Sequence, residues 1–411
     1  MKQNPLTVIV PIKPEAVGAL RDVLAKINEE LKSGANVWFR RSPSTHFARW
    51  VILDNNKQRP LQLYFSCNYD GDLDDYLGEL VDKLPPEMDE VWNKCEGYTP
   101  LGSLDAQSRK KKFAAFIKSY KLRAQAFYAA CAGASVEDIL TAAKIRQSID
   151  RVLDCQEIRP AFEEVYKLLP DFSPAPLPLT PSRPDIRAKK KDARPPHFSW
   201  LARLIEWVIG VKLGVKNPNK LINTPNDLAS IEDLMVQNQM TVITKVKRWR
   251  LLFLRGVLWG ANIGAKGTKG ALGDIATIHF CRWVIINDGK DMLFESNYDG
   301  SWENYIDDFG DSASLEMDAM WSNCEGFPTG GSLDIDWFKA YIRDNQLPAQ
   351  VFYSAYPDST VQNILNDLRI SRLVQTFMAQ VSAKRFLSGS YILTGLGSPT
   401  WKRWKKLTRV R

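Results

Sequence analysis

Histidine is scarce in this chain, since only three of its 411 residues are histidine. The six cysteines form no CxxC pair and no Cys/His spacing of the kind that binds zinc, so no structural zinc site is expected. The sequence also lacks a P-loop, a dinucleotide-binding fingerprint, a nucleophile elbow, an HExxH motif and the kinase motifs. These absences disfavour the enzyme classes that those motifs mark.

Long apolar runs and a strong charge of one sign are also missing. The N-terminal stretch "MKQNPLTVIVPIKP" has no apolar core of a signal peptide, so the sequence predicts a cytoplasmic protein with reduced thiols. The net charge of +8 is spread over the whole chain. It favours weak attraction to anionic surfaces, and nucleic acid is not an expected partner.

What the sequence does contain is a long internal repeat. The stretch "THFARWVIL" (Thr45 to Leu53) returns as "IHFCRWVII" (Ile278 to Ile286), and each copy opens with one of the few histidines. The motifs "NYDG", "CEG" and "AQxFY" recur in the same order in both halves, about 230 residues apart. A period of this length predicts a tandem duplication in which each copy is a domain.

Each copy shows the pattern of an α+β domain. Short β-branched runs predict strands, and apolar residues at helical spacing predict helices, in the order β-α-β-β-α-(α)-β-α. Without the extra helices this is βαββαβ, the arrangement of ferredoxin-like folds. We therefore expect two tandem ferredoxin-like domains, in residues 1–155 and 230–385. Their sheets would be related by a pseudo-twofold axis, as in a fused dimer, and either pack face to face or close into an α+β barrel.

Two regions lie outside the repeat. Residues 156–229 are rich in proline and basic residues, which predicts an extended linker, followed within it by an amphipathic helix at His197 to Leu213. Residues 386–411 form a basic tail that ends in "WKRWKKLTRVR". The tail is expected to be either solvated or attached to an anionic membrane surface.

The first helix of the second copy, Arg248 to Gly270, is more apolar than its counterpart. It carries Trp249 and Trp259 with basic residues at both ends, and Arg255 interrupts an apolar stretch too short to span a bilayer. One interpretation is a helix buried between the sheet and the linker helix. The other is a helix lying in the interface of an anionic membrane.

Arg49 and Arg282 are candidates for a functional site, and Arg282 and His279 are the first candidates for redox chemistry. Alternation along the repeated strand places each arginine on a face that is otherwise apolar, opposite the face that carries His46 or His279. A buried guanidinium needs an anion or several carbonyl groups. Structural partners would be Asp70 and Asp299 near the end of the next strand, or the glutamates of the "CEG" motifs. A functional partner would be a carboxylate, phosphate or haem propionate in a cavity.

The histidines and the "NYDG" turns complete the candidate set. His46 and His279 begin the repeated strands, where a histidine can either support the backbone or ligate haem. Their presence in both copies favours the supporting role. Asp70 and Asp299 precede a glycine at a tight turn and then a helix start. No metal ligand set is expected.

The pattern "HFxRWVI…NYDG…WxNCEG…AQxFYxA" resembles uncharacterised bacterial tandem-repeat proteins of the dimeric α+β barrel superfamily, which includes dye-decolorising peroxidases. The resemblance covers both halves but not the linker, and it implies a ferredoxin-like fold with haem- or peroxide-linked oxidoreductase activity. The sequence departs from the peroxidase pattern in two ways. It lacks the leading glycine of GxxDG, and the helices that follow "AQxFY" contain no histidine. A haem ligand therefore cannot be transferred residue by residue.

Two classes of function stay open. The first is a haem- or peroxide-linked oxidoreductase whose catalytic candidates are Arg282, His279, Asp299, Arg49, His46 and Asp70. The second is a non-enzymatic binding protein for an apolar or anionic small molecule, at or away from a membrane surface. Whether the protein is an enzyme, and which cofactor it holds, are left undecided by the sequence.

Overall fold

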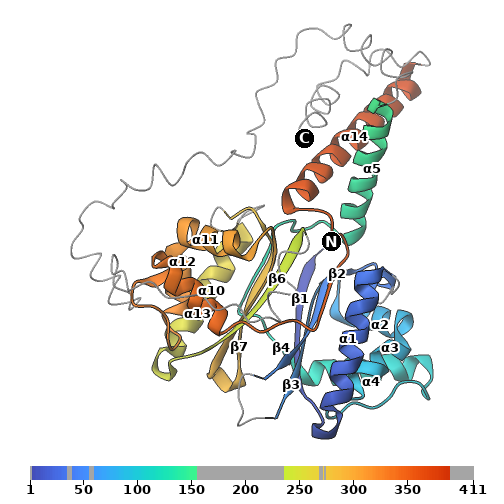
Figure 1. The fold of residues 1–411 in the computed structure, drawn as a ribbon. Helices are drawn as coiled ribbons and strands as arrows, with labels where there is room; N and C mark the ends of the chain where they lie inside the picture. The colour runs from blue at the N-terminus through green and yellow to red at the C-terminus, as the bar shows by residue number, and fades with distance from the viewer. Residues whose placement is uncertain are drawn as a thin grey trace, which may run out of the picture. The chain divides into compact units, whose positions relative to one another are not determined.

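The structure is a computed structural model that describes residues 2–34, 39–54, 60–154, 236–267, 272 and 275–388 (Figure 1). The predicted linker, its helix at residues 197–213 and the basic tail lie outside the described residues. The described chain forms two compact units. Of the described residues, the first unit contains those up to Glu137 and those from 236 to Gln362. The second unit contains the helical residues that follow Glu137 in the first copy and Gln362 in the second.

The first sheet is built mainly from the first copy. Strand β1 (Gln3–Pro11) pairs with β3 (Gln62–Asp70), and β3 pairs with β2 (Thr45–Leu53), all antiparallel. The two-residue strand β4 (Lys121–Leu122) lies on the outer side of β1. Every residue of β2 is buried, as predicted for a strand covered on both faces.

The second sheet repeats this order with β6 (Gln237–Lys245), β8 (Asp291–Asp299) and β7 (Ile278–Ile286). The last strand of each copy, however, joins the other sheet. Strand β9 (Val351–Ser354) of the second copy pairs with β2, and β5 (Ala126–Ala129) of the first copy pairs with β7. Each sheet is thus completed by the other copy.

Helices cover one face of each sheet (Figure 1). Beside the first sheet lie α1 (Val17–Ser33), α2 (Leu73–Lys83), α3 (Pro85–Trp92) and α4 (Ala106–Tyr120). Beside the second lie α10 (Leu251–Gly267), α11 (Trp302–Ser312), α12 (Ser314–Trp321) and α13 (Ile335–Asp344). The turns follow the sequence: β3 ends at Asp70, Gly71 has a φ of 85°, and Asp72 then caps α2 by accepting from the backbone N–H of Asp74.

The faces of β2 separate two cores, because side chains alternate along a strand. Ala48, Trp50 and Ile52 pack toward the helices of the first copy. Val51 and Leu53 pack in a second cluster that also contains Val284, Ile286 and Leu293 of the other sheet. The two sheets therefore meet face to face, and together with the helices they give an α+β fold with layers helix, sheet, sheet, helix. The described strands form two antiparallel sheets and no closed barrel.

The second compact unit contains most of α5 (Val136–Asp154) and of α14 (Val361–Ser388). Within it, Arg146 Nε lies 2.7 Å from Asp367 Oδ1, and this aspartate is buried. Of the helices that the structure describes, none combines the length and apolar character needed to cross a bilayer.

Candidate functional site

Arg49 reaches across the interface into the sheet of the second copy. Its guanidinium donates to the backbone carbonyls of Met240 (2.9 Å) and Ser296 (3.1 Å). It also donates to the side chains of Gln239, Thr241 and Asn297. Arg49 is therefore fully enclosed and held by groups that come from the other copy.

Arg282 makes the equivalent contacts in the opposite direction, except that Pro5 stands where Arg49 meets Gln239. It donates to the carbonyls of Leu6 (2.6 Å) and Cys67 (2.9 Å), and to the side chains of Thr7 and Asn68. Each of these positions is the repeat equivalent of one that Arg49 contacts. Reciprocal contacts of this kind are those of an isologous interface.

One carboxylate breaks the symmetry. Glu295 of β8 occupies the position that Ser66 has in β3, and its Oε1 lies 3.5 Å from Arg282 Nη2 and 3.8 Å from Arg49 Nε. The hydroxyls of Tyr64 and Ser66 both donate to its other oxygen. Burial alone would raise the pKa of Glu295, but the two guanidinium groups and these donors hold it below its ordinary value. The centre is a buried Arg–Glu–Arg cluster.

Asp70 and Asp299 are not the partners of the arginines, which corrects the structural pairing expected from the sequence. Asp70 Oδ1 lies 3.0 Å from His46 Nε2, and Asp299 Oδ1 lies 2.7 Å from His279 Nε2. The second oxygen of Asp70 accepts the backbone N–H of Val136 at the start of α5, and that of Asp299 accepts the N–H of Val361 at the start of α14. The aspartates thus tie each histidine to a helix start.

The histidines also depart from the predicted alternation. The strand ladder is interrupted between Thr45 and Phe47, at His46, and at the equivalent point in β7. This shift turns the rings toward the other copy, where the His46 ring centre lies 5.4 Å from that of Phe280. Phe47 and His279 form the reciprocal pair at 5.3 Å.

This geometry does not fit haem ligation by His46. Its Nε2 is bonded to Asp70, its Nδ1 lies 2.9 Å from the hydroxyl of Tyr356, and the side chain has no exposed surface. A haem iron needs a ring nitrogen that is free to coordinate. Among the described residues, no cluster of three or more His, Cys, Asp or Glu side chains is arranged to hold a metal ion.

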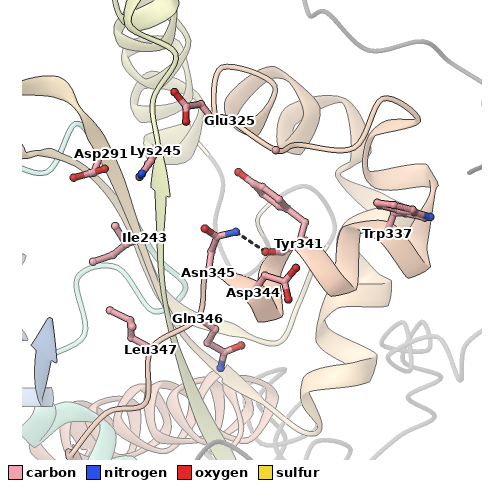
Figure 2. A pocket seen from close by; sticks show the side chains of 11 residues that line it. Ile243, Lys245, Asp291, Glu325, Trp337, Tyr341, Asp344, Asn345, Gln346 and Leu347 are labelled. Atoms are coloured by element: carbon pink, nitrogen blue, oxygen red, sulfur yellow. Dashed lines mark hydrogen bonds between the residues drawn. The ribbon is translucent and has the colours of Figure 1, made fainter. Parts of the chain in front are cut away.

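A pocket of about 580 Å³ opens elsewhere in the second copy, between the end of β6, the start of β8 and α13. Figure 2 shows its side chains around Asn345, whose Nδ2 donates to the carbonyl of Tyr341 at 2.8 Å. Its lining comprises Ile243, Lys245, Asp291, Glu325, Gly326, Trp337, Tyr341, Asp344, Asn345, Gln346 and Leu347. The segment after α13 is fixed on β6 because Leu347 N–H donates to the carbonyl of Thr241.

Substitutions between the copies explain why this pocket is open. Asn345 aligns with Tyr120 of the first copy, where the tyrosine hydroxyl lies 3.0 Å from the position of a Cβ on Gly97. Tyr120 therefore covers Gly97. The equivalent Gly326 meets only Tyr341, and at 3.8 Å. The smaller Asn345 leaves the corresponding space uncovered.

The pocket is acidic. It is lined by the carboxylates of Asp291, Glu325 and Asp344 against the single ammonium of Lys245. In the first copy Gln62 and Ser119 stand in place of Asp291 and Asp344, so the negative charge belongs to the second copy. The described residues that line it include no histidine, serine or cysteine.

Sequence reasoning identified the buried arginines and histidines but missed Glu295, Tyr356 and the pocket. Glu295 was visible as the mismatch between "FSCNYDG" and "FESNYDG" in aligned copies. Asn345 was visible in the same way against Tyr120. Only the structure, however, shows that these positions lie at the interface and at a cavity.

Comparison of the chain with protein-family models, with curated protein sequences and with solved structures finds no match. The resemblance to the dimeric α+β barrel superfamily accordingly stays a prediction.

Proposed function

We propose that this protein is a non-enzymatic binding protein whose pocket between β6, β8 and α13 takes a small organic cation. The observation that carries the proposal is the lining of that pocket, which contains three carboxylates, one ammonium and the rings of Trp337 and Tyr341. A cavity of this size lined by aromatic rings and a few charged groups is typical of small-molecule sites.

The charge selects among ligands. A lining with more carboxylates than ammonium groups favours amino or guanidinium groups and disfavours the anionic ligand that the sequence left open. Aromatic rings add to this preference, since a cation is attracted to a ring face. The expected ligand class is therefore a primary amine or diamine with a short apolar chain.

The arginine and histidine candidates support the fold in this proposal. Arg49, Arg282 and Glu295 join the two sheets, and His46 and His279 join strands to helix starts. The reciprocal contacts and the exchanged last strands support a tandem ferredoxin-like pair that resembles a fused dimer.

The test is calorimetric titration of the full chain with putrescine and spermidine, with butane-1,4-diol as the uncharged analogue. We expect saturable binding of the amines and none of the diol. Asp344→Asn and Glu325→Gln should each weaken binding about two- to fivefold, because both carboxylates are solvent-exposed.

The two copies supply a matched pair of control variants. Asn345→Tyr restores the residue of the first copy and should abolish binding by filling the pocket. Tyr120→Asn makes the reverse change in the first copy and should leave amine binding unchanged. Absence of amine binding to the wild-type chain, or full binding by Asn345→Tyr, contradicts the proposal.

A further inference from the structure

One side of α10 is apolar and exposed to solvent. Trp249, just before the helix, is 79% exposed, Leu252 is 78% exposed and Trp259 is 68% exposed. Phe253 and Ile263 are also among the exposed large apolar residues. Trp249, Leu252, Trp259 and Ile263 follow one another at separations of three, seven and four residues, which places them on one side of a helix, and Phe253 lies at the edge of that side.

The opposite side of α10 holds the helix on its sheet. Leu254 and Leu258 are completely buried there, as are Leu20 and Leu24 at the equivalent positions of α1. Packing on the sheet therefore uses the same residues in both copies and requires nothing of the outer side.

The outer sides of the two helices have diverged. Where α10 and its approach present Trp249, Leu252, Phe253, Trp259 and Ile263, the first copy presents Glu15, Gly18, Ala19, Ala25 and Glu29. The first copy shows that this fold is built without large apolar side chains on the outer side of this helix. The apolar side of α10 is thus a property of the second copy alone, and packing of the helix on its sheet does not explain it.

Charge indicates what this side contacts. Residues 245–267 contain six lysine or arginine residues and no aspartate or glutamate, whereas the equivalent residues 11–33 contain four of each sign. Arg248 and Arg255 are exposed beside the apolar side chains. The guanidinium of Arg250 lies 5.2 Å and 5.1 Å from the ring centres of Trp249 and Phe253.

From these observations we infer that the outer side of α10 lies on an anionic lipid bilayer, with its apolar side chains in the interface and its cations at the headgroups. Tryptophan and arginine around an apolar stripe suit this boundary. A second copy of the chain fits less well. A twofold contact would bring two such cationic segments together without an acid on either segment. The inference is independent of the proposed amine site, because that pocket is lined by none of the residues 246–267.

The test is co-sedimentation of the full-length protein with vesicles of phosphatidylcholine mixed with phosphatidylserine, and with vesicles of phosphatidylcholine alone. We expect binding that requires phosphatidylserine and weakens as salt is added, because salt screens charges at a surface. The triple variant Trp249→Glu, Trp259→Ala, Ile263→Glu carries the residues of α1 and should bind at least tenfold more weakly.

Two further variants separate loss of the apolar side from other effects. Leu315→Glu changes an exposed leucine on α12 and should bind like the wild type. Replacing Trp249 and Trp259 by phenylalanine keeps the apolar character and should retain most of the binding. Circular dichroism of each variant checks that its helices are intact.

Three outcomes would overturn the inference. The first is that the wild-type chain stays in the supernatant with both kinds of vesicle. The triple variant can bind as well as the wild type, which would assign binding to another segment such as residues 401–411. Finally, the wild type can form a dimer that the triple variant dissociates while neither binds vesicles, which would assign the outer side of α10 to a second copy.

Discussion

At the scale of the residue, the carboxylate of Glu295 joins the two copies because it lies near one arginine of each. Its carboxylate lies between Arg49 and Arg282, and all three side chains are buried. Removing one member of a buried ionic cluster leaves charge without compensation, which typically costs about 3–5 kcal/mol. We expect Glu295→Gln to lower the free energy of unfolding in urea by about this amount. Glu316→Gln, at an exposed position, should change it by less than about 0.5 kcal/mol.

Acid should separate the two variants further. The pKa of Glu295 in the folded protein is below its ordinary value, so its contribution to stability is present above the pKa of the unfolded chain. That contribution is lost as the pH falls through the folded pKa, when the carboxylate takes up a proton. Unfolding in urea across this acidic range should therefore show a smaller pH dependence for Glu295→Gln than for the wild type. Equal slopes would mean that folding does not lower the pKa of Glu295.

The buried histidines give a residue-scale test of the haem hypothesis. Because both ring nitrogens of His46 are bonded and its side chain is enclosed, we expect no Soret band before or after haemin is added to the purified protein. An absorption spectrum measures this directly. A Soret band that His279→Ala or His46→Ala removes would restore the oxidoreductase hypothesis and show that the interface opens to admit haem.

The burial of the arginines could be predicted from the sequence, but the identity of their acidic partner could not. An arginine on an apolar strand has to meet an acceptor, so burial and a polar partner followed from residue chemistry. The identity of the partner could not be derived in this way, because Asp70 and Glu295 are equally good partners until the packing of one sheet on the other is known. Asp70 is near in sequence to Arg49, whereas Glu295 is near only in space.

At the scale of the element, the strand exchange makes each copy incomplete. The order of strands and helices was predictable because period and turn residues are local properties of the sequence. Which sheet receives β5 and β9 is not local, since each strand is short and carries the same alternating pattern. Val351 and Tyr353 of β9 belong to the core of the first copy, so residues 1–155 alone contain only part of that core.

Separate expression of the copies tests this dependence. We expect a fragment of residues 1–155 to lack fixed tertiary structure, because β2 would have an unpaired edge and the core would lack Val351 and Tyr353. Mixing it with a fragment of residues 230–411 should restore near-ultraviolet circular dichroism and give a one-to-one complex on a sizing column. If the first fragment alone unfolds cooperatively as a monomer, the exchange is not essential to the core.

At the scale of the whole molecule, the two copies should unfold as one. Both sheets lie in a single compact unit, with exchanged strands and arginines that bond across the interface. Leu24→Ala in α1 and Leu258→Ala in α10 remove equivalent buried leucines, each at a cost of about 2–5 kcal/mol. Because the copies share one core, we expect either variant to reduce the hydrogen-exchange protection of β3 and β8 amides alike. Loss of protection in β3 alone for Leu24→Ala, with β8 unchanged, would instead show two copies that fold independently and are merely joined by a chain.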